Sequence, residues 1–387
     1  MFNIKTYNNI SDKGLSRFPE DSYAVTDSAE NPDAIILRSA DLHSMEVNAS
    51  LKAVGRAGAG TNNVPVEMLT GKGVPVFNAP GANANAVKEL VIAGMLLACR
   101  NIVQAWDYVN QVEGTTEEKH KAVEAGKKKY VGYELPGRTL GVVGLGAIGV
   151  KVANAAVALG MRVIGYDPGV TVQSAWQLSS DVEQMKSVDQ LLQQCDFVSF
   201  HVPLMDATRG LLNAERLSRM HDGVVVLNFA RQGIVDDSAI LDGIETGRVG
   251  AYVCDFPSEQ LESNPRVITL PHLGASTAEA EENCAIMVAD QVMDFLENGN
   301  IRNSVNFPNI DLVRDGDSRL AIANRNMPDM VGQISHVLGT AGVNIKHMRN
   351  ESRGDIAYTL MDIDSAINEE AMAQISDIEG VLSVRQI

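Results

Sequence analysis

Residues 139–160 read TLGVVGLGAIGVKVANAAVALG, and this stretch decides the fold of the central part of the chain. The apolar run TLGVV predicts a buried strand, and AIGVKVANAAVALG predicts the helix that follows it. Between them, Gly144, Gly146 and Gly149 have the spacing G-x-G-x-x-G. A strand, a glycine turn and a helix in this order are typical of a unit that binds a dinucleotide.

The glycines of this turn have separate physical roles. Gly144 permits the tight turn, Gly146 lets the backbone approach a pyrophosphate, and Gly149 lets helix and strand pack closely. Ala147 and Ile148 open the helix, whose N-terminus attracts an anion. We therefore expect the five residues to hold the phosphates of a dinucleotide.

Asp167 ends the next predicted strand, RVIGYD, 18 residues after Gly149. A carboxylate here accepts hydrogen bonds from both hydroxyls of an adenosine ribose and repels a 2′-phosphate. The sequence therefore predicts NAD rather than NADP as the cofactor. The simpler alternative is that the turn only closes a strand-helix unit and that Asp167 caps a strand.

Outward from this stretch, short apolar runs alternate with helical segments. The central unit continues through DFVSFHV, GVVVLNFA, VGAYVCDF and RVITLPH, and a second set (PDAIILRS, LKAVGRAG, VPVFNAP) precedes it. Such alternation predicts parallel sheets with helices on both faces. The charged, glycine-containing residues 113–138 predict a surface connection between two bodies.

The last 70 or so residues follow a different pattern. A segment rich in Asn, Asp and Gly predicts a linker after a helix at 277–296, and the order βαββαβ then begins near Arg319, which is typical of a ferredoxin-like fold. We predict an α/β protein with two doubly wound parallel-sheet domains and this third domain. The expected borders are 1–100 with 286–306 (flavodoxin-like, substrate-binding), 101–285 (Rossmann, NAD-binding) and 315–387.

The chain has 387 residues, of which 45% are apolar, and this fits two to three domains with sizeable cores. Lysine and arginine number 32 against 49 acidic residues, a formal net charge of −17. Such a field repels nucleic acid and acidic membrane surfaces, so we expect neither as a partner. An anionic ligand must be held by a local group of arginines.

The sequence also bears on localisation and metal content. The longest strongly apolar run, Leu90 to Cys99, has ten residues, which is too short for a bilayer span and predicts a buried helix. The N-terminus turns polar at once, so we expect a cytoplasmic protein. Cys99, Cys195, Cys254 and Cys284 lie far apart, which favours buried thiols and disfavours a metal site or a disulfide framework.

Three strands of the central unit are followed by polar residues of different kinds. Arg231 follows GVVVLNFA, Glu259 lies just beyond VGAYVCDF, and His272 follows RVITLP. Ligands of parallel α/β sheets bind outside the carboxyl ends of the strands, so we expect these side chains to converge. Taken singly, each has a simpler explanation: a loop-bridging arginine, a solvated acid, or a histidine at a strand end.

Hydride transfer at a 2-hydroxy acid requires such a set of groups. Arg231 can grip the substrate carboxylate bidentately and polarise the oxygen on C2. His272 can accept the hydroxyl proton as hydride leaves. Glu259, hydrogen-bonded to the far ring nitrogen of His272, would fix its tautomer and stabilise its protonated form.

The blocks GVVGLGAIG, NFARQGIVDD, CDFPSE and LPHLGAST resemble those of the D-isomer-specific 2-hydroxyacid dehydrogenases, and the resemblance covers nearly all of the chain. The C-terminal module is similar to the ACT domains of those members that oxidise 3-phospho-D-glycerate. The resemblance implies NAD-dependent oxidation of 3-phospho-D-glycerate to 3-phosphooxypyruvate, the first step of serine biosynthesis. It also implies that Arg231, Glu259 and His272 form the catalytic set.

Further cofactor contacts are implied by the resemblance alone. Asp255 would contact the nicotinamide amide, and Ala230 and Gly274 would line the nicotinamide site. His201 and Pro203 would flank the adenosine half.

The sequence departs from the family pattern at two loop positions. Gln232 stands where Gly is common, and Gln260 stands where Pro is common. These departures alter loop stiffness rather than the reacting groups.

Substrate selection is predicted to lie in the N-terminal unit. Arg38 and Arg56 end neighbouring strands, and two guanidiniums there can hold a phosphate despite the acidic chain. The loop after Arg56, with Ala57 and Gly58, can present backbone N–H groups to a carboxylate, and Asn78 can add a donor. The alternative is that both arginines are structural ion-pair partners.

The resemblance to ACT domains also implies regulation and assembly. Such domains pair across a two-fold axis and bind amino acids between subunits, so we expect a homodimer or homotetramer. Asn324 and Asn326 lie at the strand-to-helix turn, and we hypothesise that serine binds there as an effector. Asp329 follows Pro328 where these modules commonly carry Gly, so the alternative is that the module serves only in assembly.

Two other functions stay open from the sequence. The first is another D-2-hydroxyacid dehydrogenase, acting on glycerate, glyoxylate or lactate. A requirement for the phosphate group of the substrate would distinguish the predicted enzyme from such a dehydrogenase. The second is a NAD-sensing interaction protein without turnover. The joint presence of Arg231, Glu259 and His272 speaks against the second.

Overall fold

A computed structural model describes residues 1–262, 264–316 and 318–387. The chain forms two compact units, one of residues 1–83 with 278–387 (unit 1) and one of residues 84–277 (unit 2). In the described part of the chain, every helix is too short or too polar to cross a lipid bilayer.

Unit 2 contains a seven-stranded, fully parallel sheet in the order β12-β11-β10-β9-β6-β7-β8. Its strands are β6 (Thr139–Val143), β7 (Arg162–Tyr166), β8 (Val182–Gln184), β9 (Phe197–Phe200), β10 (Val224–Asn228), β11 (Val249–Cys254) and β12 (Val267–Thr269). From β6 the chain builds the sheet outward in both directions, with β7 on one side of β6 and β9 on the other, so this is the topological switch point of the sheet. In open α/β sheets, ligands bind outside the carboxyl ends of the strands at such a point.

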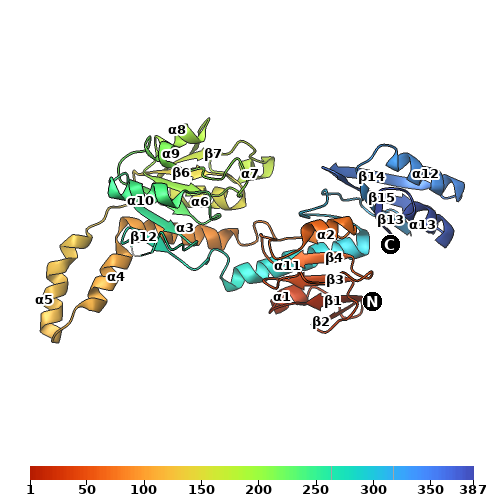
Figure 1. The fold of residues 1–387 in the computed structure, drawn as a ribbon, viewed down its shortest axis with the longest axis horizontal. Coiled ribbons are helices and arrows are strands. Elements are labelled where there is room, and N and C mark those ends of the chain that lie inside the picture. Colours follow the sequence, from red (N-terminus) through yellow and green to blue (C-terminus); the bar gives the residue numbers. More distant parts are fainter. Residues whose placement is uncertain (263, 317) are drawn as a thin grey trace. The chain divides into compact units, whose positions relative to one another are not determined.

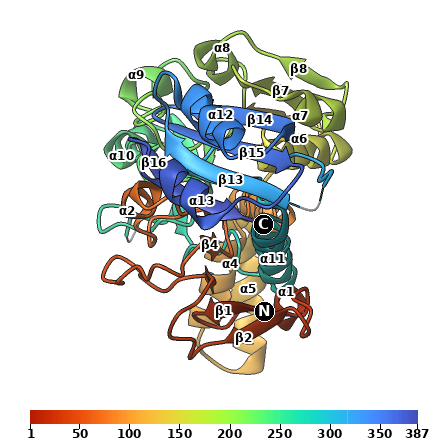
Figure 2. The same ribbon diagram turned by 90° about the vertical axis from the view of Figure 1, so that its right-hand side faces the viewer.

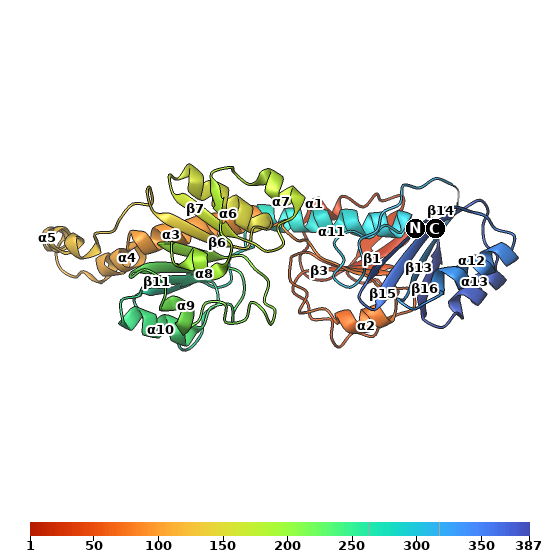
Figure 3. The same cartoon turned by 90° about the horizontal axis from the view of Figure 1, so that it is seen from above.

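Helices cover both faces of this sheet (Figure 3). One face packs on α3 (Ala84–Cys99) and α6 (Ala147–Ala158), and the other on α8 (Val188–Leu192), α9 (Ala214–Leu217) and α10 (Asp237–Glu245). The short α7 (Val172–Gln177) follows β7. Because both faces are covered, the central strands β6, β9 and β10 are buried along their whole length rather than alternating, as the sequence runs predicted.

Residues 113–138, expected to connect two bodies, lie inside unit 2. They contribute α5 (Thr116–Gly126) and the 3₁₀ turn Lys127–Tyr130, which together with α4 (Ile102–Gln111) extend away from the sheet (Figure 1). Thr115 and Glu118 form a capping box that starts α5, so this charged stretch is helical. These residues therefore do not connect the two units, and a good helix start makes the stretch helical despite its polar composition.

Unit 1 begins with a five-stranded parallel sheet in the order β2-β1-β3-β4-β5. Its elements are β1 (Phe2–Thr6), α1 (Asp12–Leu15), β2 (Tyr23–Thr26), β3 (Ala34–Leu37), β4 (Ala53–Arg56), α2 (Val66–Gly71) and β5 (Val76–Phe77). This is the flavodoxin-like order. The long helix α11 (Ala278–Asn298) packs on it so closely that a Cβ atom on Gly55 would lie 2.4 Å from Val288 Cγ1.

The C-terminal module has the predicted βαββαβ order, with a four-stranded antiparallel sheet β14-β15-β13-β16. Its elements are β13 (Ser318–Arg325), α12 (Met330–Thr340), β14 (Ile345–Arg353), β15 (Ile356–Ile363), α13 (Glu369–Ser376) and β16 (Val381–Gln386). Both helices lie on one face (Figure 2), and the other face packs on the end of α11 and the segment after it. The predicted fold class is confirmed.

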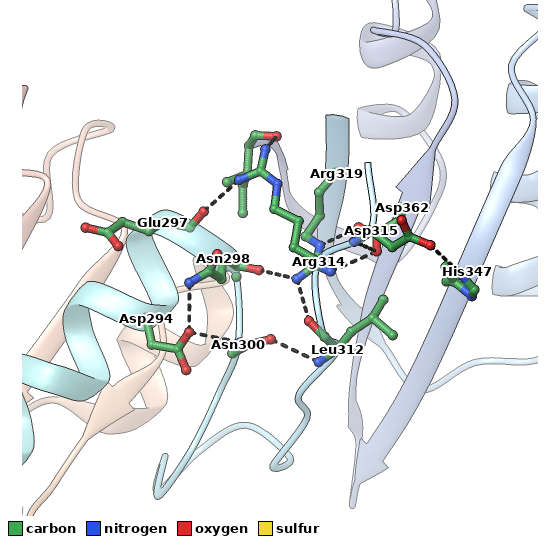
Figure 4. A network of polar contacts seen from close by, with 12 residues as sticks. Asp294, Glu297, Asn298, Asn300, Leu312, Arg314, Asp315, Arg319, His347 and Asp362 are labelled. Carbon is green, nitrogen blue, oxygen red and sulfur yellow. Dashed lines mark hydrogen bonds and ion pairs between the residues drawn. The ribbon is translucent and has the colours of Figure 1, made fainter. Parts of the chain in front are cut away.

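A buried ion pair fastens this module to the end of α11 (Figure 4). Arg319 donates to both carboxylate oxygens of Asp362 at 2.6 and 2.9 Å, and its third nitrogen donates to the carbonyls of Asn298 and Leu312. Both charged side chains are fully buried. Burial raises the pKa of Asp362, but hydrogen bonds from Arg319 and from the Asp315 N–H outweigh it and hold that pKa below its ordinary value.

The two units divide the chain at positions other than the expected borders at 100 and 285. Helix α3 packs on α6, β10 and β11, so residues 84–100 belong to unit 2. Helix α11 packs on α1 and β4, so its whole length belongs to unit 1. The C-terminal module shares a hydrophobic cluster with α11 and is therefore part of the same unit.

Candidate functional site

The glycine turn lies between β6 and α6, at the carboxyl edge of the unit 2 sheet. Gly144 has a φ of +92°, and a Cβ atom there would lie 2.6 Å from the His201 carbonyl oxygen. A Cβ atom on Gly149 would lie 1.9 Å from the Gly144 carbonyl oxygen. Two of the three glycines are therefore required by the close approach of backbone to backbone.

Gly146 differs from the other two glycines because it faces open space. A Cβ atom there would have no described atom within 4 Å, and Gly146 and Ala147 are exposed. Gly146 is also the N-cap of α6, and no side chain caps this helix end. Ile148 lies in the same first turn. The uncapped N–H groups of this turn and the helix dipole make the helix end electropositive, which fits a pyrophosphate.

Asp167 closes one side of this turn. Its carboxylate accepts hydrogen bonds from the N–H groups of Leu145 and Gly169, each at 2.8 Å. The carboxylate is thus held by backbone at the end of β7, next to the turn, and keeps lone pairs for a ligand. This geometry fits the ribose of a dinucleotide.

His201 follows β9 on the other side of the turn. Its Nε2 lies 2.9 Å from Ser199 Oγ, while Nδ1 is buried and has no hydrogen-bond partner among the described residues. Burial lowers the pKa of His201 to about 4, so the ring is neutral at physiological pH. Pro203, two residues further, is exposed. A neutral imidazole beside the turn suits contact with a base or a sugar better than proton transfer.

Asp255 lies at the end of β11 and is almost fully buried. One carboxylate oxygen accepts a hydrogen bond from the Gly274 N–H at 3.1 Å, while Oδ1 is buried with no partner in the described structure. Burial raises the pKa of Asp255, and the Gly274 N–H and the charges of His272 and Arg231 oppose this rise. An unsatisfied buried acceptor fits a donor that a ligand supplies, such as a carboxamide.

His272 follows β12 and is tied to the same residue. Its backbone N–H donates to the Asp255 and Leu270 carbonyls, each at 3.1 Å, and its φ is +36°. This backbone conformation is strained for a residue other than glycine. The exposed imidazole meets the Phe256 ring edge-on at 5.2 Å between centroids. The neighbouring hydrogen bonds thus hold His272 in a conformation that it would not adopt by itself.

Arg231 lies in the loop after β10, which neighbours β11 in the sheet. Buried Asn228 braces this loop: its side chain donates to the Arg231 carbonyl at 3.0 Å and accepts from the Ala230 N–H at 3.2 Å. The guanidinium is exposed and donates to the Ala230 carbonyl. Arg231 follows β10 and His272 follows β12, and these strands are the two neighbours of β11, which precedes Asp255, so both residues lie at the same edge of the sheet.

Glu259 is exposed, and no hydrogen bond or ion pair joins it to His272 among the residues that the structure describes. The imidazole instead contacts the ring of Phe256, which lies in the same β11–β12 loop as Glu259. The expected contact between Glu259 and the far ring nitrogen is therefore not formed here, and the assignment of Glu259 to the catalytic set stays a prediction.

The predicted substrate residues lie together in unit 1, at the carboxyl edge of its sheet. Arg38 follows β3, Arg56 ends β4, and the Arg56 guanidinium covers Gly58, where a Cβ atom would lie 1.8 Å from Nη1. Ala57 is buried, and Asn78 donates to the Ala59 carbonyl at 2.6 Å. Asn78 therefore clamps the glycine loop rather than pointing its donor away from it.

The predicted effector residues have different environments. Asn324 is buried and donates to the Arg325 carbonyl at 2.6 Å, while its own oxygen has no partner in the described structure. Asn326 is exposed and donates to the Gly354 carbonyl at 3.1 Å. Asp329 has a φ of +66°, the left-handed conformation that favours glycine.

The four cysteines are buried and unpaired, which confirms the expectation of buried thiols. Burial raises the pKa of the Cys195 thiol to about 12, so this group is inert at neutral pH.

Sequence reasoning missed two residues that shape the predicted site. Asn228 is a buried polar residue at the end of an otherwise apolar strand, and that signal was readable. Glu281, in the first turns of α11, forms an ion pair with Arg38 at 2.6 Å. No sequence pattern indicated this pair, because its two residues are 243 positions apart.

Comparisons with known proteins show which proteins this chain is similar to. The family model described as D-isomer specific 2-hydroxyacid dehydrogenase, NAD binding domain, matches residues 92–274. The chain is 32% identical to D-3-phosphoglycerate dehydrogenase of Haemophilus influenzae, over 88% of this chain and 82% of that protein. It is 35% identical to D-3-phosphoglycerate dehydrogenase of Archaeoglobus fulgidus, but covers only 58% of that longer protein.

A solved structure is also similar. NAD⁺-bound 3-phosphoglycerate dehydrogenase of Entamoeba histolytica matches with a TM-score of 0.59 and 25% identity. The match covers 79% of this chain and 98% of that one.

Proposed function

The chain belongs to the D-isomer specific 2-hydroxyacid dehydrogenase family, and from this premise we propose that it oxidises 3-phospho-D-glycerate to 3-phosphooxypyruvate with NAD. The observation that carries the proposal is the 32% identity to a D-3-phosphoglycerate dehydrogenase over most of both chains. The placement of Arg231 and His272 after the two strands that neighbour β11, with the His272 N–H donating to the Asp255 carbonyl, supports it. The reaction belongs to serine biosynthesis.

NAD, when bound, supplies the acceptor for the hydride that leaves C2 of the substrate. The chain's own residues do the rest. Exposed Arg231, on a loop braced by Asn228, grips the substrate carboxylate and withdraws charge from the C2 oxygen. His272 accepts the hydroxyl proton in oxidation and returns it in reduction. Asp255 positions His272 through the backbone hydrogen bond and offers Oδ1 to the carboxamide.

The preference for NAD over NADP follows from Asp167. Its carboxylate is held beside the turn by two backbone N–H groups, so a 2′-phosphate would lie against a fixed negative charge. Replacing Asp167 with Ser should raise the use of NADP relative to NAD by about tenfold or more. Steady-state rates with both cofactors measure this, and an unchanged ratio would remove Asp167 from the ribose site.

The test of the proposed function is the formation of NADH from 3-phosphoglycerate, compared with D-glycerate and D-lactate at equal concentrations. A clear preference for the phosphorylated substrate supports the proposal. A preference for D-glycerate or D-lactate would support another D-2-hydroxyacid dehydrogenase instead. The absence of NADH formation with all three substrates, in a protein that binds NADH, would support a non-catalytic role.

We also propose that the chain is a homo-oligomer. The support is α4, on which none of the residues is buried and where Ile102, Val103, Trp106 and Val109 are exposed. An apolar helix face of this kind is typical of a surface that another chain covers. Light scattering on the wild type and on a Trp106→Ser, Val109→Ser variant measures the assembly, and a monomeric wild type would refute the proposal.

We propose serine as an effector of the C-terminal module and the cytoplasm as the location. The buried Asn324 with its unpaired oxygen supports a polar ligand near the β13–α12 turn. Unpaired thiols suit a reducing compartment. Serine at millimolar concentration should change the rate or the thermal midpoint, and an effect on neither would rule out serine binding.

A further inference from the structure

Arg38, expected to hold an anionic group of the substrate, already has a partner. Its Nη1 lies 2.6 Å from Glu281 Oε1, which is at charge-assisted hydrogen-bond distance. Arg38 follows β3 and Glu281 lies near the start of α11, so the pair joins the sheet edge to the helix within unit 1. A ligand anion can use Arg38 fully only by displacing this carboxylate.

The surroundings of the pair form a small charged cluster. Cys284, one turn further along α11, is 3% exposed, and its pKa is raised by burial while the charges of Arg56 and Arg38 oppose this. Arg38 reaches this part of α11 through its ion pair with Glu281, and β4, which ends at Arg56, packs on the same helix.

The exposure of the pair allows it to exchange. The side chains of Arg38 and Glu281 are 30% and 43% exposed, unlike the fully buried pair of Arg319 and Asp362. A half-exposed ion pair contributes little to stability, because water screens it and solvates the separated partners. An incoming anion can thus take Arg38 without breaking the fold.

Neighbouring acids on the same helix show that the position of Glu281 is specific. Glu282 forms an ion pair with Lys13 at 2.6 Å rather than with either arginine. Glu279, like Glu281, lies in the first turn of α11, but among the described residues its carboxylate forms no side-chain hydrogen bond or ion pair. Both Glu279 and Glu281 can interact favourably with the positive N-terminal end of the helix dipole. Only Glu281 of these two also forms an ion pair with Arg38.

We propose that Glu281 is the counter-ion of this arginine site and determines its charge specificity. Without ligand it neutralises Arg38. When the phosphate of a substrate takes Arg38, the Glu281 carboxylate lies beside it and repels a doubly charged group more than a singly charged one. Glu281 thereby weakens the binding of phosphate-bearing ligands. This inference rests on the proposed function, because it takes Arg38 as a phosphate ligand.

The test compares Glu281→Gln with the matched control Glu279→Gln in the full chain saturated with NADH. Calorimetric titration measures the dissociation constants of 3-phosphoglycerate, D-glycerate and inorganic phosphate. We expect Glu281→Gln to tighten the binding of 3-phosphoglycerate by about tenfold and of D-glycerate by less than about twofold. Glu279→Gln should resemble the wild type, and the tightening should vanish when Arg38→Met is combined with Glu281→Gln.

The inference is overturned if Glu281→Gln binds 3-phosphoglycerate no more tightly than Glu279→Gln does, or more weakly, since Glu281 would then be a spectator or a ligand. Persistence of the tightening in the Arg38→Met background also overturns it. A wild type that does not oxidise 3-phosphoglycerate refutes the proposed function. In that case, tighter inorganic phosphate binding by Glu281→Gln still supports the counter-ion role, and its absence refutes that role too.

Discussion

Substituting alanine for Gly146 or for Gly149 adds the same single carbon to the same turn, yet the structure predicts opposite outcomes. At Gly149, the new Cβ atom would lie 1.9 Å from the Gly144 carbonyl oxygen. At Gly146, it would meet no described atom within 4 Å. The first variant therefore tests the packing of α6 on β6, and the second tests the open space in front of the helix.

The cost at Gly149 is set by the backbone. Ordinary contact begins at 3.4 Å, so the start of α6 must move about 1.5 Å away from the turn. Such overpacking costs about 3 kcal/mol, against about 1 kcal/mol gained because alanine favours the helix more than glycine does. A net loss of about 2 kcal/mol corresponds to a fall of about 4–8 °C in the thermal midpoint of a unit this size.

At Gly146, the fold should be unaffected, while NADH binding should weaken by about tenfold or more, because the added carbon occupies the space of the pyrophosphate. Differential scanning fluorimetry gives the midpoints, and quenching of protein fluorescence gives NADH affinity. The reasoning is refuted if Gly149→Ala melts like the wild type, or if Gly146→Ala binds NADH as tightly as the wild type does.

Three further outcomes are expected. Replacing His272 with Gln should lower turnover about a thousandfold while NADH affinity changes little, because the imidazole transfers a proton and does not hold the cofactor. Replacing Arg319 with Met should lower the free energy of unfolding, measured in urea, by about 3–5 kcal/mol, because it leaves the Asp362 carboxylate buried without its ion-pair partner. The double variant Arg319→Met, Asp362→Leu should recover most of this free energy. Burial lowers the pKa of His201 from 6.5 to about 4, so as the pH falls the imidazole is protonated in the unfolded chain before it is protonated in the folded one. The free energy of unfolding should therefore decrease by up to about 3 kcal/mol as the pH falls from 6.5 to about 4. His201→Gln should make the free energy of unfolding less dependent on pH in this range.

Each of these outcomes has a clear contrary result. A large loss of NADH binding in His272→Gln would give the imidazole a cofactor role instead. Equal losses in the single Arg319 variant and in the double variant would show that the packing of the arginine stem, not its charge, holds the module. An unchanged pH slope in His201→Gln would place the acid sensitivity in other groups.

Much of the fold was predictable because its signals are local. The parallel strands are continuous apolar runs, and the glycine turn has a fixed spacing, so both are readable without distant contacts. Capping boxes are equally local, and the one formed by Thr115 and Glu118 could have identified α5. The domain borders were less accessible, because α3 and α11 are assigned by the sheets on which they pack.

The candidate site likewise combines features that local sequence predicts with features that depend on distant contacts. By itself, the sequence determined the turn that can accept a dinucleotide, the acid at the end of β7, and the arrival of Arg231 and His272 at one edge of a sheet, because strand order and side-chain chemistry require only short stretches of chain. Only the tertiary structure decided that Arg38 forms an ion pair with Glu281 and that Arg319 and Asp362 form a buried pair. Such contacts depend on loop conformations and on side chains that lie far apart in the chain, and their free energies are small differences between desolvation and attraction that exist only once the backbone is in place.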